Sequence, residues 1–242
     1  MSEDLAKSVR DLLDVDPDEF RSRAAADAEV VKTGIREGAF DNHQSIVGLE
    51  YEFYAVADGR WAGESHGGEY ALMRVPRRML ELIGFEKELG FHNAEMTISP
   101  QPFNAQGLRA QEAEVLARLE AALDCTSTEG MRLVSDGMWT IPPVGETARG
   151  YLTDSVSDDG IRIATNMSRA VRYHAMANQP DPDRESTLDA PLVELSADTV
   201  MPESLITSIQ PHYQVKQAVD LPLAFNYALR IAGPLLALCV NS

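Results

Sequence analysis

The sequence predicts an α+β fold, because separate segments of its 242 residues carry the apolar period of strands and of helices. Ile46 to Val56 alternates between two faces with the period of two that is typical of a strand. Gln106 to Leu123 instead repeats its apolar residues with the period of an amphipathic helix. With 44% hydrophobic residues, the chain can bury the core of one or two domains.

The first 45 residues differ from the rest of the chain. Residues 2 to 38 are charged and helix-prone, and Asp16-Pro17 is a typical start for the second of two predicted helices. We identify no chemistry in this segment. We therefore interpret residues 1 to 45 as a helical N-terminal extension, packed on the body or on a partner, and residues 46 to 242 as a separate domain.

Further elements follow the strand at Ile46 to Val56. A second strand is predicted at Glu95 to Ser99, ended by Pro100 and Pro102. The helix at Gln106 to Leu123 should bury a stripe of leucines and one valine. The stripe consists of Leu108, Val115, Leu116, Leu119 and Leu123. The remaining predictions are a strand at Met131 to Ile141, a loop at Gly145 to Gly160, a helix at 165 to 178, a linker at Asn178 to Asp189, a strand at Ile206 to Val215 and a helix at Pro222 to Val240, kinked or broken near Pro234.

The apolar stretch Leu221 to Val240 is the only one that resembles a membrane span. It contains Asn226, Arg230 and Gly233-Pro234, and one central arginine costs about 2.5 to 3.5 kcal/mol on insertion. We therefore expect a buried helix and no membrane partner.

The charge balance excludes one class of partner. Lys+Arg 21 against Asp+Glu 38 gives a net charge of −17, whereas nucleic-acid binding needs clustered positive charge. Only four of the cations are lysines, which favours a salt-adapted host over an ordinary acidic protein. Two cysteines without metal-ligand spacing and a start without a leader pattern indicate a cytoplasmic protein.

A pair of glutamates on the first strand is a candidate metal site. Glu50 and Glu52 share one face, with Cβ atoms about 7 Å apart, and such a pair can hold a divalent ion. The alternative is that they form the solvent-exposed face of an amphipathic strand. The spacing alone favours that alternative.

The surrounding residues support the metal site. The string Gly48-Leu49-Glu50-Tyr51-Glu52-Phe53 resembles the G-x-E-x-E-F opening strand of the glutamate-cysteine ligase family, and Asn93 to Pro100 resembles its second signature. The resemblance implies that Glu95 is a third carboxylate facing the metal. Glu88 is interpreted as a solvated glutamate at a helix end.

Weaker likenesses follow downstream. Ser168 to Tyr173 resembles a family segment that ends in Arg-Tyr, so Arg172 could bind a substrate carboxylate, although a surface arginine is an equal alternative. Gln210 to Val215 resembles a family strand in which His212 and Gln214 face the site. Trp139, in another family-like segment, is expected in the core.

The resemblance implies a glutamine-synthetase-like fold, a curved and largely antiparallel sheet covered by helices. It also implies that ATP, with Mg²⁺ or Mn²⁺, activates the γ-carboxylate of glutamate as an acyl phosphate that the amine of cysteine attacks. The implied roles are catalysis for Glu52, Glu95 and His212, substrate binding for Arg172 and Gln214, and metal binding for Glu50, Glu52 and Glu95.

Several alternatives stay open. The amine could be another one, the chain could be a non-catalytic binding or regulatory protein, and homo-oligomers are compatible with the sequence. The family pattern runs on past Asn241-Ser242, so we expect the sheet to be incomplete at the C-terminus and the chain alone to lack ligase activity.

Overall fold

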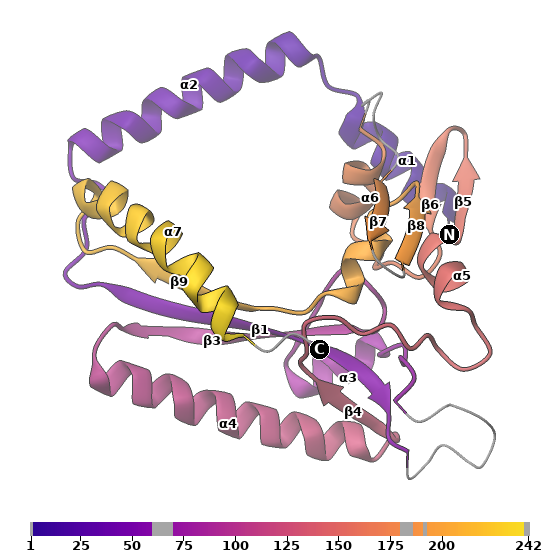
Figure 1. The fold of residues 1–242 in the computed structure, drawn as a ribbon. Coiled ribbons are helices and arrows are strands. Elements are labelled where there is room, and N and C mark those ends of the chain that lie inside the picture. The colour runs from indigo at the N-terminus through magenta and orange to yellow at the C-terminus, as the bar shows by residue number, and fades with distance from the viewer. Residues whose placement is uncertain (1, 60–69, 180–185, 191–192, 240–242) are drawn as a thin grey trace. The chain divides into compact units, whose positions relative to one another are not determined.

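A computed structural model describes residues 2–59, 70–179, 186–190 and 193–239, and it confirms the α+β class (Figure 1). The helices are α1 (Ser2–Leu13), α2 (Pro17–Arg36), α3 (Arg77–Ile83), α4 (Ala105–Ser127), α5 (Ala148–Thr153), α6 (Val171–Ala177) and α7 (Leu221–Leu238), with the short 3-10 helices η1 (Met201–Leu205) and η2 (Ala218–Asp220). The strands are β1 (Ile46–Ala57), β2 (Glu86–Lys87), β3 (Asn93–Pro102), β4 (Met131–Val134), β5 (Ser155–Asp158), β6 (Ile161–Ala164), β7 (Ser186–Ala190), β8 (Val193–Ala197) and β9 (Ile209–Gln214).

The main sheet has the order β2-β3-β1-β4, and β9 also pairs with β1. Near one end of β1, Ala55 N donates to His92 O at 2.8 Å. Near the other end, a Cβ atom placed on Gly48 would lie 3.9 Å from Pro100 Cγ. Because one end of β1 thus meets the start of β3 and the other end meets its final residues, the two strands run antiparallel. This register controls where the acidic side chains of β1 and β3 lie.

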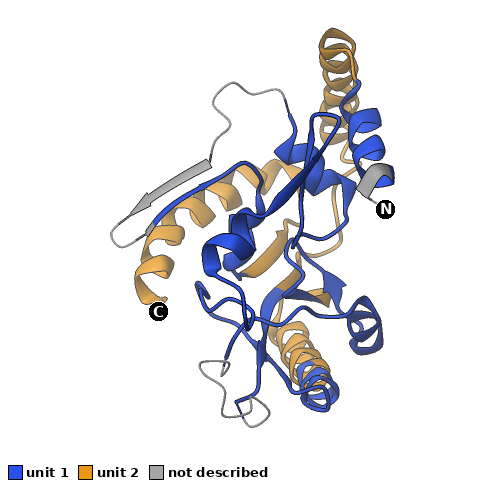
Figure 2. Ribbon diagram, turned by 90° about the vertical axis from the view of Figure 1, so that its right-hand side faces the viewer, with its two compact units in different colours: residues 1–14, 51–96, 119–208 blue, residues 15–50, 97–118, 209–242 orange. Residues whose placement is uncertain are grey.

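The chain divides into two compact units, shown in Figure 2. Unit 1 consists of residues 1–14, 51–96 and 119–208, and unit 2 of residues 15–50, 97–118 and 209–242. Strands β1 and β3 and helix α4 each continue from one unit into the other. This division differs from the domain boundary that we predicted between residues 45 and 46. That boundary stays a prediction.

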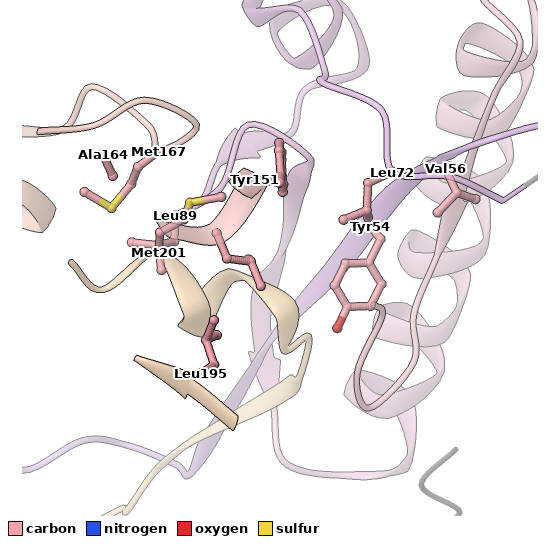
Figure 3. Packing of buried hydrophobic residues seen from close by; sticks show 10 residues of the cluster. Tyr54, Val56, Leu72, Leu89, Tyr151, Ala164, Met167, Leu195 and Met201 are labelled. Carbon is pink, nitrogen blue, oxygen red and sulfur yellow. The ribbon is translucent and has the colours of Figure 1, made fainter. Parts of the chain in front are cut away.

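Unit 1 has an apolar core around Tyr54 and Tyr151 (Figure 3). Tyr54 is fully buried, and its hydroxyl donates to Leu205 O. Burial raises the pKa of Tyr54 to about 12, so this hydroxyl stays protonated. Trp139, which was expected in the core, is half-buried; it packs against the same cluster and donates its indole N–H to Tyr70 O at 2.9 Å.

Helix α1 forms a second apolar cluster in unit 1. Leu5, Ala6 and Val9 are buried with Ile161 and Ile163 of β6. The first predicted helix is therefore confirmed, and it packs on the body of unit 1. Helix α2 also begins as predicted, since the Asp16 carboxylate accepts hydrogen bonds from two backbone N–H groups of the first turn.

The predicted apolar stripe of α4 is wrong. Leu108 and Leu116 are 46% and 62% exposed. The buried positions of this helix are instead Gly107, Gln111, Ala122 and Thr126. In unit 2, the Gln111 amide donates to Val47 O at 2.6 Å, so small and polar residues let α4 approach the strands closely.

Two other predictions need correction. The expected loop at Gly145 to Gly160 contains α5 and the first strand of the β5-β6 hairpin. Thr147 caps α5 by accepting from Gly150 N, and Asp159-Gly160 form the hairpin turn with φ of 48° and 80°. Part of the expected linker, Ser186–Ala190, is a strand paired with β8, while 180–185 lie outside the described residues.

Element boundaries also shift. Strand β3 continues through Pro100 to Pro102, β4 ends at Val134, and α6 begins only at Val171. Both Pro100 and Pro102 lie at the end of β3, where missing backbone donors are tolerated. The predicted turn at Asn241-Ser242 lies outside the described residues.

Helix α7 is not buried, contrary to our expectation. No described residue of α7 is buried, and Leu238 is 80% exposed. The helix is unbroken at Pro234. Ala218–Leu238, with a mean hydropathy of 1.4, is the single helical stretch in the described chain that is long and apolar enough to cross a membrane.

Candidate active site

Glu52 lies on β1 in unit 1 and is held by the backbone of residue 208. Its carboxylate Oε2 accepts from Ser208 N at 2.8 Å, and its own N–H donates to Ser208 O at 3.0 Å. The side chain is half-buried. One carboxylate oxygen is therefore fixed in place by a backbone donor.

Glu95 lies on the neighbouring strand β3. Ala55 is hydrogen-bonded to His92, and β1 and β3 run antiparallel. Three residues before Ala55 is Glu52, and three residues after His92 is Glu95. Glu52 and Glu95 are therefore cross-strand neighbours. Glu95 is half-buried and pairs across the β2-β3 hairpin with Glu86. The hairpin thus adds acidic groups on the same side of β3.

Glu88 follows β2 directly and is not the solvated helix-end residue that we expected. It is half-buried, and the Tyr173 hydroxyl donates to its carboxylate, with distances of 2.8 and 2.9 Å to the two oxygens. The correction has a physical reason, because Glu88 continues an edge strand of the sheet and meets the first turn of α6.

Arg172 and Tyr173 extend this contact into a chain of polar groups. An Arg172 N–H donates to the Tyr173 hydroxyl at 2.8 Å, and the guanidinium lies 4.7 Å from the centre of the Tyr173 ring. The hydrogen bond to Tyr173 raises the pKa of Arg172, and the charges of Glu88 and Glu95 add to this effect. Arg172 is exposed, so a cation borders the carboxylates and remains accessible to a ligand.

His92 connects this region to the core of unit 1. The Ser204 carbonyl lies 2.8 Å from Nε2 and can only accept, so Nε2 carries the proton and Nδ1 accepts from the Tyr151 hydroxyl at 2.8 Å. The Arg74 guanidinium lies 5.2 Å from the centre of the Tyr151 ring and binds Glu146 and Asn166. Burial lowers the pKa of His92 to about 4.

This shift predicts a loss of stability in acid. The pKa of His92 is about 4 when folded against 6.5 for the free side chain, so the unfolded chain binds the proton more tightly. The contribution is present above pH 6.5 and is lost as pH falls toward 4, by on the order of 3 kcal/mol. Urea denaturation between pH 4 and 7 should show the free-energy gap between the wild type and His92→Gln narrowing as pH falls. A gap that stays constant with pH would contradict the neutral, buried His92.

The remaining predicted site residues lie in unit 2. His212 Nε2 is 3.0 Å from Glu50 Oε2, so β9 brings this histidine to the first glutamate of the pair. Gln214 is exposed and lines a groove with Phe40 and Val215. The structure thus joins His212 to Glu50, while Gln214 lines the groove.

The chemistry of these carboxylates suits Mg²⁺, which prefers oxygen ligands and is often held by one or two carboxylates plus substrate phosphate. Among the residues that the structure describes, no group of three or more His, Cys, Asp or Glu side chains could hold a metal ion.

Sequence reasoning assigned Glu88 wrongly and missed the structural role of His92. Strand β2 has two residues, too few to show an alternating pattern. Gly90 and Asn93 are residues typical of turns, and they could have indicated a turn before β3. In the structure Gly90 N donates to Asn93 Oδ1 at 2.9 Å. That loop places Glu88 beside the strand of Glu95.

Comparison with known proteins gives one match. The family model described as Glutamate-cysteine ligase family 2 matches residues 46–242. No match was found among curated proteins or among solved structures.

Proposed function

Because the chain belongs to glutamate-cysteine ligase family 2, whose members are carboxylate-amine ligases, we propose that it joins the γ-carboxylate of glutamate to the amine of cysteine. The observation that carries this proposal is the position of Glu52 and Glu95 on neighbouring strands, next to the chain from Glu88 through Tyr173 to Arg172. Carboxylates suit a metal-bound nucleotide, and an accessible arginine suits an amino-acid carboxylate.

The reaction needs no covalent enzyme intermediate. A γ-carboxylate oxygen of glutamate attacks the γ-phosphorus of ATP, and ADP leaves with the electron pair of the broken phosphorus–oxygen bond. The amine nitrogen then attacks the acyl carbon, the carbon–oxygen bond to phosphate breaks, and the nitrogen releases a proton. When bound, Mg²⁺ or Mn²⁺ neutralises charge on the phosphate oxygens.

The residues of this chain would hold and orient the reactants. Within unit 1, Glu52 and Glu95 would bind the ion. Arg172 would hold the α-carboxylate of glutamate, and Tyr173 keeps its guanidinium in place through the 2.8 Å hydrogen bond. The roles predicted from the sequence for residues of unit 2 stay predictions: metal binding for Glu50, a phosphate contact for His212 and a substrate contact for Gln214. Positioning of this kind contributes several kcal/mol to lowering the barrier.

The test is phosphate release from ATP with Mg²⁺, glutamate and one amine, omitting each component in turn. It is run with the chain alone and with a second chain that carries the family sequence downstream of Ser242. We expect release to require both glutamate and amine and to be about tenfold or more faster with cysteine than with other amines. A different preferred amine would favour a related ligase, and ATP binding without turnover in both samples would favour a non-catalytic binding protein.

A further inference from the structure

A cavity of about 190 Å³ lies in unit 1, and its wall is built from α1, β5, β6, α6 and the segments next to them. Most of the wall is apolar, formed by Leu5, Phe91, Val156, Ile163, Ala164 and Met167. Leu5 belongs to α1, which lies outside the residues 46–242 that match the family. The cavity thus depends on a helix that the family model does not include, and no role in the ligase reaction accounts for it.

The wall also contains a buried histidine, His174 on α6, which is 1% exposed. Its Nε2 lies 3.0 Å from Ser168 O, and because a carbonyl oxygen can only accept, Nε2 carries the proton. Burial lowers the pKa of His174, so the ring is neutral at pH 7 and Nδ1 is an acceptor. Within the described part of the chain no group donates a hydrogen bond to this buried Nδ1.

A buried acceptor without a donor destabilises a folded protein, so a donor that enters the cavity is bound more tightly if it reaches His174 Nδ1. Water is a poor occupant, because a buried water usually makes about three hydrogen bonds. The Thr165 hydroxyl in the same wall already donates to Asp154 Oδ2 at 2.8 Å. A molecule that needs one polar contact and otherwise apolar surroundings fits this wall better than water does.

The charge and the size of the cavity define the ligand further. Arg169 is the one residue with a full charge among the described residues of the wall, and a positive charge disfavours an ammonium donor nearby. The donor is therefore an uncharged hydroxyl or N–H group. The volume of the cavity is similar to that of an apolar cavity of about 150 Å³ that holds one benzene molecule. A molecule the size of a single ring fills it.

We propose that this cavity is a binding site for a small, uncharged, mainly apolar molecule whose one hydroxyl or N–H group donates to His174 Nδ1. The body of the ligand packs against Leu5, Ile163 and Met167, of which Met167 is labelled in Figure 3. Because Leu5 comes from α1, a bound ligand also holds this helix on the body of unit 1. The site is separate from the proposed ligase reaction and does not depend on it.

The test compares phenol with toluene, which has almost the same size and no donor. Calorimetry measures the binding of each probe to this chain. We expect phenol to bind about fivefold or more tightly than toluene, although toluene is the more hydrophobic molecule, because phenol alone supplies a donor to the buried acceptor. Phenol should also slow hydrogen exchange at the backbone amides of α1. In His174→Gln the side-chain amide can still donate to Ser168 O but Nδ1 is lost, so the preference for phenol should disappear.

His43→Gln is the matched control, because His43 is exposed in unit 2 and is not among the described residues that line the cavity. It should keep the preference for phenol, and circular dichroism checks that both variants fold. If His174→Gln does not fold, the two wild-type measurements decide.

Three results overturn the proposal. The first is toluene binding as tightly as phenol to the wild type, or no binding of either probe at millimolar concentrations, which would mean that the cavity holds water. The second is a preference for phenol that a folded His174→Gln retains. The third is phenol binding that leaves hydrogen exchange in α1 unchanged, since the ligand would then lie elsewhere.

Discussion

Glu52→Gln should lower Mg²⁺-dependent turnover by about 100-fold or more while leaving the fold intact. The amide keeps the size of the side chain and an oxygen that can still accept from Ser208 N, 2.8 Å away in the wild type. It removes the negative charge that a divalent ion requires. The effect should therefore appear in catalysis and metal binding but not in the melting temperature.

The measurement combines phosphate release by an active form of the protein with Mn²⁺ binding followed by electron paramagnetic resonance. Glu120→Gln is the matched control. Glu120 is exposed on α4 and is separated in sequence from all candidate site residues. Turnover and Mn²⁺ affinity equal to those of the wild type in Glu52→Gln would remove Glu52 from the site.

The sequence predicted part of this site because some signals are local. The pair Glu50 and Glu52 on a predicted strand depends only on neighbouring residues, and the strand is confirmed as β1, although burial along it does not alternate residue by residue. Glu88 depends on pairing across a hairpin and on Tyr173, 85 positions away. No local pattern contains such a contact, so the sequence could not distinguish it from a solvated glutamate.

Gly107→Ala should be strongly destabilising, by about 3 kcal/mol. A Cβ on Gly107 would lie 1.9 Å from Pro102 O and 2.9 Å from Pro102 C, and both are backbone atoms that cannot rotate away. Relief would require moving the segment that caps α4, in which Asn104 Oδ1 accepts from Gln106 N and Gly107 N. The change should thus lower the melting temperature and loosen the start of α4.

Gly233→Ala in α7 is the matched control, because a Cβ there meets nothing within 4 Å. Alanine is the better helix former by about 0.5 to 1 kcal/mol, so this variant should be slightly stabilised. Urea denaturation of both variants checks the pair. Equal stabilities of Gly107→Ala and the wild type would show that α4 does not approach Pro102 as closely as described.

The fold predictions also succeeded where the signal was local and failed where tertiary contacts decided the structure. Helix α2 was placed correctly because Asp16-Pro17 is a capping signal that acts within one turn. The stripe of α4 was wrong because its leucines have helical spacing, yet tertiary packing selected Gly107, Gln111 and Ala122 for close approach. The Asp159-Gly160 pair is typical of a hairpin turn, but the sequence analysis assigned it to a loop. Each flanking strand has only four residues, too few to show a clear alternating pattern.

Helices α2 and α7 bury no described residue. Most of their apolar surface is already in contact with water, so the unfolding of these helices exposes little additional apolar surface. The sensitivity of a protein to denaturant, and the heat capacity change on unfolding, both grow with the surface that unfolding newly exposes. Both quantities will therefore be smaller for this chain than its 242 residues suggest. The backbone amides of these two helices will exchange hydrogen with solvent by local fraying, long before the strands of the sheet open.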